Sequence, residues 1–352
     1  MRAHTRLRAA TSLLGPPQPK VARNAAKYLQ GVITSSVHTP SGDPRTDGFY
    51  SAFLSAQGRV LHDVIVYPDS SKPVGEGFLI DVDADEAGRL ERHIKRYKLR
   101  AKFAVRLVDV GEMAVWAAWG EGVAVKKAEG EITVADPRCP ALGWRMVTSR
   151  ERPEVDVEEV EEREYTIRRY LAGVPEGQKE ILREQALPLE SNMDIMGGID
   201  FRKGCYVGQE LTIRTKHRGV VRKRILPCMI YPEDKPAPQE LVYSPDSLAA
   251  PGGFRTAEEI PTETSIGRVE KKGRSAGKWL AGIGNVGLAL CRLEIMTDLR
   301  LPGEASSGTG FSPGDEFVLT EKVEGDGSGR KVKVKAFVPA WLRQGLEQGG
   351  HS

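Results

Sequence analysis

Segments with the two-residue period of strands and segments with the helical period follow one another irregularly along this chain. That mixture restricts the possible folds more than any other feature. Residues 49–54 and 59–67 predict a β-hairpin. Residues 83–97 predict an amphipathic helix that begins with a capping box of Asp83 and Glu86. Because strands and helices do not alternate regularly, the pattern favours an α+β fold over a doubly wound parallel sheet.

The rest of the chain continues this mixture and ends in strands. It predicts a second hairpin from residues 103–110 and 113–119, a helix at 178–185 and a short strand at 211–215. Residues 231–264 are rich in proline, serine and acidic residues, which predicts a long surface insertion. The last third predicts a small all-β domain from the strand-like segments 266–269, 287–293, 316–319 and 331–338.

Length and composition describe an ordinary globular protein. At 352 residues the chain is long enough for two or three domains of roughly 150 residues each. Its 40% hydrophobic and 28% charged residues fit real cores with a solvated surface. The net charge of +3 does not indicate a general polyanion binder, and we expect no nucleic-acid partner. No run of residues approaches the roughly 20 apolar positions of a membrane span.

The four cysteines, Cys139, Cys205, Cys228 and Cys291, lie far apart in the sequence. None forms a Cys-x-x-Cys pair, so neither a self-contained zinc site nor a ferredoxin-like cluster site is predicted. A disulfide framework is equally unexpected in a chain of this length with so few cysteines. We therefore expect a reducing compartment.

The N-terminal region carries arginine and lysine but no acidic residue before Asp43. This bias is typical of a mitochondrial transit peptide, and the cations that produce it are Arg2, Arg6, Arg8, Lys20 and Arg23. Alternatively, residues 9–14 form a first strand, in which case the fold starts near Leu7 and most of a transit peptide is missing. Both interpretations stay open from the sequence.

Residues 203–210, Lys-Gly-Cys-Tyr-Val-Gly-Gln-Glu, form the most informative motif for function. Cys205 follows Arg202 and Lys203, and neighbouring positive charge favours the thiolate, which is the nucleophilic and metal-ligating form of cysteine. The two glycines permit unusual backbone angles and the close approach of another molecule. The alternative is an ordinary structural cysteine at a turn, although such residues more often lie among apolar neighbours.

The motif and its surroundings resemble the YgfZ-type family of iron–sulfur cluster assembly factors. These proteins are relatives of the glycine-cleavage T-protein, a folate-dependent aminomethyltransferase. The resemblance spans roughly residues 7–293, the motif is its most specific part, and a basic start with eukaryote-like insertions resembles the mitochondrial member. The further matching segments are Tyr28-Leu29-Gln30-Gly31, Gln57-Gly58-Arg59, Leu187-Pro188-Leu189-Glu190, Arg214-Thr215-Lys216-His217-Arg218-Gly219 and Gly287-Leu288-Ala289-Leu290.

The resemblance implies an α+β chain of three small domains arranged as a ring. The first domain would combine residues 1–48 and 130–215 and carry the cysteine motif. Residues 49–129 would form a second domain inserted into the first, and both would be mixed α/β. The third would be the β-rich residues 216–352, with the surface insertion at 231–264.

The resemblance also implies late-stage maturation of 4Fe–4S proteins in the mitochondrial matrix, with aconitase-type and lipoyl-synthase-type clients. A cluster usually takes four protein ligands, so Cys205 alone predicts an iron–sulfur cluster shared with a partner. The family implies an A-type iron–sulfur carrier as that partner, with the chain a monomer alone and a heterodimer with the carrier. This is a binding role rather than an enzymatic one.

The neighbours of Cys205 are candidates for its support. Arg202 and Lys203 are expected to tune the thiol, to pair with a carboxylate of the partner, or to be plain surface cations. Tyr206 is expected to pack beneath the loop. The remaining motif residues are expected to shape the loop, the last two by hydrogen bonds to its backbone; they are Gly204, Gly208, Gln209 and Glu210.

A basic segment follows the motif and predicts a rim that steers an acidic partner or the glutamyl tail of a folate. A solvated strand edge is the alternative. Nucleic-acid binding is not favoured, because no aromatic residues interleave to stack bases. By resemblance to the T-protein, Glu190 and Asn192 are candidate folate contacts, or else helix caps. The segment contains Arg214, Lys216, His217, Arg218, Arg222, Lys223 and Arg224, with His217 also a candidate ligand or base.

The sequence leaves two alternatives to the assembly role. A tetrahydrofolate-dependent aminomethyl or other one-carbon transferase would need folate and a carboxylate rather than Cys205. Residues 34–36 read Thr-Ser-Ser where relatives often have an Asn-Asp pair, and the T-protein enzymes lack the cysteine motif, so both differences count against this rival. A thiol redox enzyme is the weaker rival, because no resolving cysteine lies nearby in the sequence.

Overall fold

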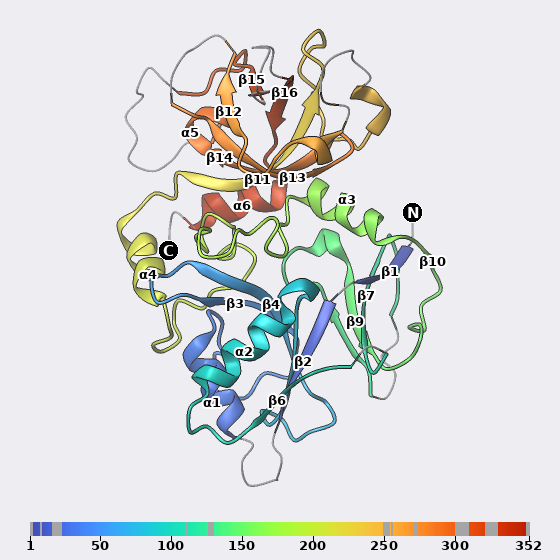
Figure 1. Ribbon diagram of the computed structural model, residues 1–352, viewed down its shortest axis with the longest axis vertical. Coiled ribbons are helices and arrows are strands. Elements are labelled where there is room, and N and C mark those ends of the chain that lie inside the picture. Colours follow the sequence, from blue (N-terminus) through green and yellow to red (C-terminus); the bar gives the residue numbers. More distant parts are fainter. Residues whose placement is uncertain are drawn as a thin grey trace. The chain divides into compact units, whose positions relative to one another are not determined.

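The chain forms two compact units in a computed structural model (Figure 1). Unit 1 comprises Met1–Tyr165, Glu176–Pro188 and Met193–Arg214, and unit 2 comprises Thr166–Pro175, Leu189–Asn192 and Thr215–Ser352. The residues that the structure describes are 3–7, 9–15, 23–109, 111–125, 130–248, 254, 256–269, 274–299, 310–320 and 330–349.

The first sheet of unit 1 is antiparallel throughout and has the strand order β3-β4-β5-β2-β6. Its strands are β2 (Ala9–Gly15), β3 (Phe49–Leu54), β4 (Val60–Pro68), β5 (Phe78–Asp83) and β6 (Ala104–Leu107). The predicted hairpin is confirmed as β3 and β4, with Phe49 opposite Val66. Helices α1 (Arg23–Val32) and α2 (Ala87–Tyr97) share one apolar core with this sheet.

The second sheet of unit 1 has the strand order β10-β1-β7-β9-β8. Its strands are β1 (Ala3–Leu7), β7 (Ala114–Trp119), β8 (Ile132–Ala135), β9 (Trp144–Thr148) and β10 (Glu158–Glu159). Strand β1 pairs with β10 in parallel and with β7 antiparallel. Residues 3–15 therefore give one strand to each sheet of unit 1, and the strand predicted at residues 9–14 is confirmed as β2.

The predicted hairpin of residues 103–110 and 113–119 is wrong. Both strands exist, but β6 pairs with β2 in the first sheet, whereas β7 pairs with β1 and β9 in the second. The two-residue period identifies strands without naming their partners, and here the turn at Gly111 leads the chain from one sheet to the other.

The predicted capping box at the start of α2 is also wrong. Asp83 Oδ1 accepts a hydrogen bond from Asp85 N at 3.0 Å, and a 3-10 turn over Ala84–Glu86 precedes the helix. The Glu86 carboxylate makes no capping bond and instead accepts from Arg89 Nη1 at 2.9 Å. The sequence pattern located the helix correctly, but its first turn is tighter than an α-helix.

Two further element predictions fail for tertiary reasons. Residues 178–185 form single turns rather than a helix, because Glu184 N donates to Val60 O at 2.8 Å and Val60 N donates to Ala186 O at 3.0 Å. Residues 211–215, predicted as a short strand, lie inside helix α4 (Gln209–Arg218). Strand propensity is a weak prior that packing overrides.

Unit 2 is built on a closed antiparallel barrel with the order β11-β14-β13-β12-β15-β16, which confirms the predicted all-β last third. Gly287 of β14 has no room for a side chain, since a Cβ there would lie 2.5 Å from Trp279 Cζ2. The strands are β11 (Lys223–Tyr231), β12 (Ser265–Arg268), β13 (Gly277–Ile283), β14 (Val286–Arg292), β15 (Phe317–Thr320) and β16 (Lys331–Ala336).

Short helices accompany the barrel. Helix α5 (Leu293–Met296) follows β14, and α6 (Ala340–Gly349) follows β16. Helix α3 (Glu162–Ala172) enters unit 2 from unit 1, and its Ala172 O accepts a hydrogen bond from Trp341 Nε1 at 2.9 Å. Within the described ranges, no helix has the length and apolarity needed to cross a bilayer.

The region predicted as a surface insertion, residues 231–264, lies only partly at the surface. Tyr231 ends strand β11, and the buried apolar residues of the described part are Leu248, Phe254, Ala257 and Ile260. These residues belong to the core of unit 2. The division of the whole chain into three domains at the boundaries given above stays a prediction.

Candidate functional site

Cys205 lies in an exposed loop of unit 1 that leads into helix α4. It is exposed, whereas Cys139, Cys228 and Cys291 are buried. Gly204 beside it has open space where a side chain would stand, with nothing within 4 Å of an ideal Cβ. The thiol is therefore accessible to a macromolecule from this side.

Lys203 holds this loop from within. Its Nζ donates hydrogen bonds to Ile33 O at 2.7 Å and Ser35 O at 2.9 Å, and it lies 5.0 Å from the centroid of the Tyr206 ring. Burial lowers the pKa of Lys203 to about 8, because desolvation disfavours the ammonium. Of the expected roles, that of a plain surface cation is wrong for Lys203; it fits Arg202, whose side chain is exposed.

Backbone hydrogen bonds tie the same loop to the last turn of α1 and to the segment that follows it. Val207 N donates to Gly31 O at 3.0 Å, and Asp200 N donates to Thr34 O at 3.0 Å. Thr34 Oγ1 in turn donates to Gly198 O at 2.5 Å and accepts from Ala52 N at 2.9 Å. Thr34 belongs to the Thr-Ser-Ser stretch compared above with an Asn-Asp pair. Its hydroxyl therefore stabilises the backbone around the cysteine loop.

Side chains of the motif itself complete the loop. Gln209 Oε1 accepts a hydrogen bond from Tyr206 N at 3.1 Å, which is the backbone support expected of Gln209. Tyr206 is buried beneath the loop, and burial raises its pKa to about 12. Glu210 lies exposed on the first turn of α4.

Two glycines let the loop rest directly on the β3–β4 turn. At Gly208, where φ is +79°, a Cβ would lie 2.3 Å from Ser55 O and 3.2 Å from Gly58 Cα. At Gly58 a Cβ would lie 2.8 Å from Gly208 O. The close approach expected at Gly208 is thus made by the protein's own hairpin, and only Gly204 leaves space for another molecule.

Glu190 and Asn192 lie in unit 2, where they hold strand β11. Asn192 Nδ2 donates to Ile225 O at 2.7 Å, and Ile225 N donates to Glu190 O at 2.8 Å. The Glu190 carboxylate lies 3.4 Å from Lys223 Nζ. Asn192 is buried in this arrangement at a φ of +61°. A folate contact by either residue stays a prediction.

The predicted basic rim does not follow one strand edge. Its first residues, 214–218, are helical in α4, where Arg214 and His217 are exposed and Lys216 is partly buried. Farther along, Arg224 is buried in β11 and Nη1 donates to Leu189 O at 2.7 Å. The strand-edge alternative is therefore wrong for the helical part, and Arg224 is not a surface residue.

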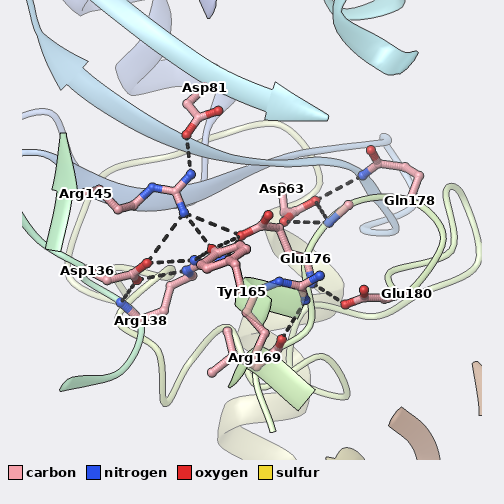
Figure 2. Close-up of polar contacts among 12 residues, drawn as sticks. Asp63, Asp81, Asp136, Arg138, Arg145, Tyr165, Arg169, Glu176, Gln178 and Glu180 are labelled. Carbon is pink, nitrogen blue, oxygen red and sulfur yellow. Dashed lines mark hydrogen bonds and ion pairs between the residues drawn. The ribbon is translucent and has the colours of Figure 1, made fainter. Parts of the chain in front are cut away.

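A cluster of charged and polar side chains is buried in unit 1 (Figure 2). The sequence patterns did not predict it. Arg138 Nη2 donates to Asp136 Oδ2 at 2.7 Å, and Arg145 Nη2 donates to Asp81 Oδ2 at 2.5 Å. Figure 2 shows both guanidinium groups meeting at Tyr165, whose hydroxyl accepts from them at 2.8 and 2.9 Å. Each buried charge thus has an opposite charge in contact, as burial requires.

Asp63 lies at the edge of this cluster, and both of its carboxylate oxygens accept from Gly177 N at 3.2 Å. Gln178 Nε2 donates to it as well. Burial first, and then the negative charge of Glu176, raise the pKa of Asp63 to about 6. The nearby Tyr50 hydroxyl is buried without a hydrogen-bond partner among the described residues. In the sequence, Asp63 is an acidic residue inside the otherwise largely apolar strand 60–68, and this could have indicated a buried carboxyl.

Solved structures identify the fold. The chain is similar to the glycine cleavage system aminomethyltransferase T from Bartonella henselae, with a TM-score of 0.61 and 12% sequence identity over 97% of this chain and 87% of that one. Residues 222–344 match the family described as "CAF17, C-terminal beta-barrel domain". Together these findings define an aminomethyltransferase-like fold that ends in a CAF17-type barrel, which confirms the predicted fold class.

Similar curated proteins identify the family within this fold. The chain is 60% identical to the iron–sulfur cluster assembly factor IBA57 homolog, mitochondrial, of Pyricularia oryzae, over 93% of this chain and 83% of the relative. It is 52% identical to the protein of the same description from Chaetomium globosum, over 93% and 82%. The chain belongs to the family of mitochondrial iron–sulfur cluster assembly factor IBA57 homologues. The predicted family and the mitochondrial location are thereby confirmed.

Proposed function

We propose that this protein acts in late-stage maturation of mitochondrial 4Fe–4S proteins, and that it binds an A-type carrier through an iron–sulfur cluster to which Cys205 contributes one ligand. One observation carries the proposal: Cys205 is exposed, while the other three cysteines are buried. The general assembly role is supported by relatives that are named as iron–sulfur cluster assembly factors.

A shared cluster follows from the number of ligands. Among the described residues, no group of three or more His, Cys, Asp or Glu side chains could hold a metal ion. A cluster usually takes four protein ligands, so a carrier must supply those that Cys205 does not. Val207, 44% exposed two residues away, adds an apolar contact for such a carrier. The chain is then a monomer alone and a heterodimer with its carrier.

The loop is suited to transfer because it holds the thiol in one place. The ammonium of Lys203 binds backbone carbonyls just after α1, and the amide of Val207 binds the Gly31 carbonyl in the last turn of α1. A ligand that is fixed before binding loses less entropy when the complex forms. The carrier docks, the cluster is bridged at Cys205, and iron–sulfur units pass to aconitase-type and lipoyl-synthase-type clients.

The test is anaerobic mixing of the protein with a 2Fe–2S-loaded A-type carrier, followed by visible absorption and co-elution. The variants are Cys205→Ser and, as a matched control, Cys228→Ala, which removes a buried thiol of unit 2. We expect a coloured heterocomplex with wild type and Cys228→Ala, and loss of colour or oxygen lability with Cys205→Ser. If wild type neither binds the carrier nor changes its spectrum, the proposal is wrong.

A second candidate is a tetrahydrofolate-dependent one-carbon transferase, and Asp63 is the observation that favours it. A buried carboxyl with a pKa of about 6 is suited to exchange a proton near neutral pH. This candidate predicts tetrahydrofolate binding and one-carbon turnover that Asp63→Asn abolishes and Cys205→Ser leaves intact. Absence of tetrahydrofolate binding by wild type, measured by calorimetry, would eliminate it.

A further inference from the structure

Helix α2 and the turn that follows it concentrate positive charge on unit 1. Residues 87–106 contain eight lysine or arginine residues and one acidic residue, whereas the whole chain has a net charge of only +3. That acidic residue, Glu91, already forms an ion pair with Lys95 at 2.7 Å. The helix buries Leu90 and Ile94 against the first sheet, so most of its cations face solvent.

Four of these cations are exposed and form no ion pair within the described parts of the chain; they are Arg92, Arg96, Arg100 and Lys102. Two others are already neutralised, since Arg89 pairs with Glu86 and Arg106 pairs with Glu112. The four unpaired cations thus provide a local positive field that no acidic side chain among the described residues of unit 1 cancels by contact.

Two apolar side chains project from the same surface. Leu99 is 83% exposed, and Tyr97, the one residue of the apolar face of α2 that packing does not bury, is 51% exposed. Tyr97 is nevertheless held in place, because its ring lies 4.7 Å from the His93 ring and 5.6 Å from the guanidinium carbon of Arg96. An ordered aromatic ring and a projecting leucine therefore lie among the cations.

Leu99 is also strained. It follows the C-cap Lys98 of α2 and has a φ of +47°, the left-handed conformation for which glycine is the usual residue. Its exposure shows that the fold gains little apolar burial in return for this strain. A strained residue with no packing reason at its position points to a function outside the fold.

We propose that these residues, Arg92, Arg96, Tyr97, Leu99, Arg100 and Lys102, which we call the α2 patch, bind the surface of an anionic lipid bilayer. The cations contact phosphate headgroups, Tyr97 lies at the headgroup level, and Leu99 enters the boundary of the acyl chains. Attachment of this kind is peripheral and reversible, and it requires no membrane span.

The geometry favours lipid over other acidic partners. A nucleic acid would be held by several exposed aromatic rings that stack on bases, whereas the patch exposes only Tyr97. A folded protein partner offers a pocket of fixed shape to its anchor residues. A single projecting leucine among long, unpaired cations suits a deformable surface that provides many phosphates and an apolar layer beneath them.

The test is co-sedimentation of the full chain with vesicles of phosphatidylcholine alone or of equimolar phosphatidylcholine and phosphatidylglycerol. We expect binding only to the anionic vesicles and weaker binding at high salt. The double variant Arg96→Gln, Arg100→Gln should bind about 25-fold more weakly, at about fivefold per cation. Leu99→Gly, which keeps the left-handed turn and removes the apolar side chain, should bind about tenfold more weakly.

The matched control is Lys179→Gln, Lys235→Gln, which removes the same charge from exposed positions outside the patch and should bind like wild type. Equal loss of binding in this control and in the patch variant would overturn the proposal, because net charge alone would then explain binding. Wild type that binds neutral and anionic vesicles equally would overturn it too. So would salt-sensitive binding to an RNA oligomer or an acidic polypeptide without binding to anionic vesicles.

Discussion

Replacing Gly208 with alanine tests whether the Cys205 loop rests on the β3–β4 turn. The new Cβ would lie 2.3 Å from Ser55 O and 3.2 Å from Gly58 Cα, both of which are backbone atoms that cannot rotate away. A φ of +79° costs an alanine about 1–2 kcal/mol. Overpacking against backbone adds about 1–3 kcal/mol. We therefore expect unit 1 to lose about 2–5 kcal/mol of unfolding free energy.

The assay is urea unfolding followed by intrinsic tryptophan fluorescence, to which the buried Trp116 of unit 1 contributes, together with hydrogen exchange of the loop amides. Gly204→Ala is the matched control, because it adds the same methyl group in the same motif with nothing within 4 Å. Its unfolding free energy should stay within about 0.5 kcal/mol of wild type. The amide of Val207, which donates to Gly31 O, should exchange faster in Gly208→Ala alone.

The two variants must differ for the reasoning to hold. Equal urea midpoints and equal exchange at Val207 for Gly208→Ala and Gly204→Ala would show that the loop does not lie against the hairpin turn. The contact at Ser55 O would then not explain the glycine at this motif position, and the structural account of the cysteine loop would be refuted.

Three further substitutions probe the interior of unit 1, each by urea unfolding. Lys203→Met leaves two backbone carbonyls without their donor and should cost about 2–4 kcal/mol, with faster exchange in the loop; unchanged stability would contradict the anchoring role. Arg145→Met leaves Asp81 buried without its partner and should cost about 3–5 kcal/mol. The exposed Arg150→Gln should cost less than about 1 kcal/mol, and equal losses would argue against this account. The Asp63 carboxyl has a pKa of about 6 in the fold against an ordinary 3.8, so its stabilising effect, present below the lower value, is lost as pH rises towards the higher. Asp63→Asn should therefore flatten the decline of stability between about pH 4 and about pH 7 by about 3 kcal/mol, and an unchanged decline would refute the shift.

Local alternation of apolar and polar residues was enough to predict the elements whose pairing is local. The hairpin of β3 and β4 and the barrel strands β12, β14, β15 and β16 were predicted in this way, whereas β11 and β13 were not predicted. It failed where the partner of a segment is distant. Strand β6 and strand β7 are neighbours in the chain but pair in different sheets. Within residues 178–185, Glu184 N bonds to Val60 O of β4 instead of continuing a helix. Pairing across long stretches of chain is a tertiary property that periodicity does not encode.

The candidate site shows the same limit. The motif predicted that Cys205 is the accessible thiol, and the structure places it in an exposed loop. The charge of Lys203 suggested an effect on that thiol, yet its ammonium binds two carbonyls of a segment about 170 residues earlier in the chain. The cluster around Arg145 was missed because each member looks like an isolated polar residue until the two sheets of unit 1 bring them together.

The motif of residues 203–210 contains residues that face solvent and residues that face the protein. Gly204, Cys205, Val207 and Glu210 face solvent, whereas the positions that face the protein are Lys203, Tyr206, Gly208 and Gln209. The residues that face the protein contact only its own backbone and core, so they hold the loop in its conformation. The residues that face solvent include one reactive group, a glycine that leaves space beside it and an apolar contact. A motif that is specific over eight positions can therefore present a single thiol, because half of it is used to hold that thiol in a fixed place where a partner can complete its ligand set.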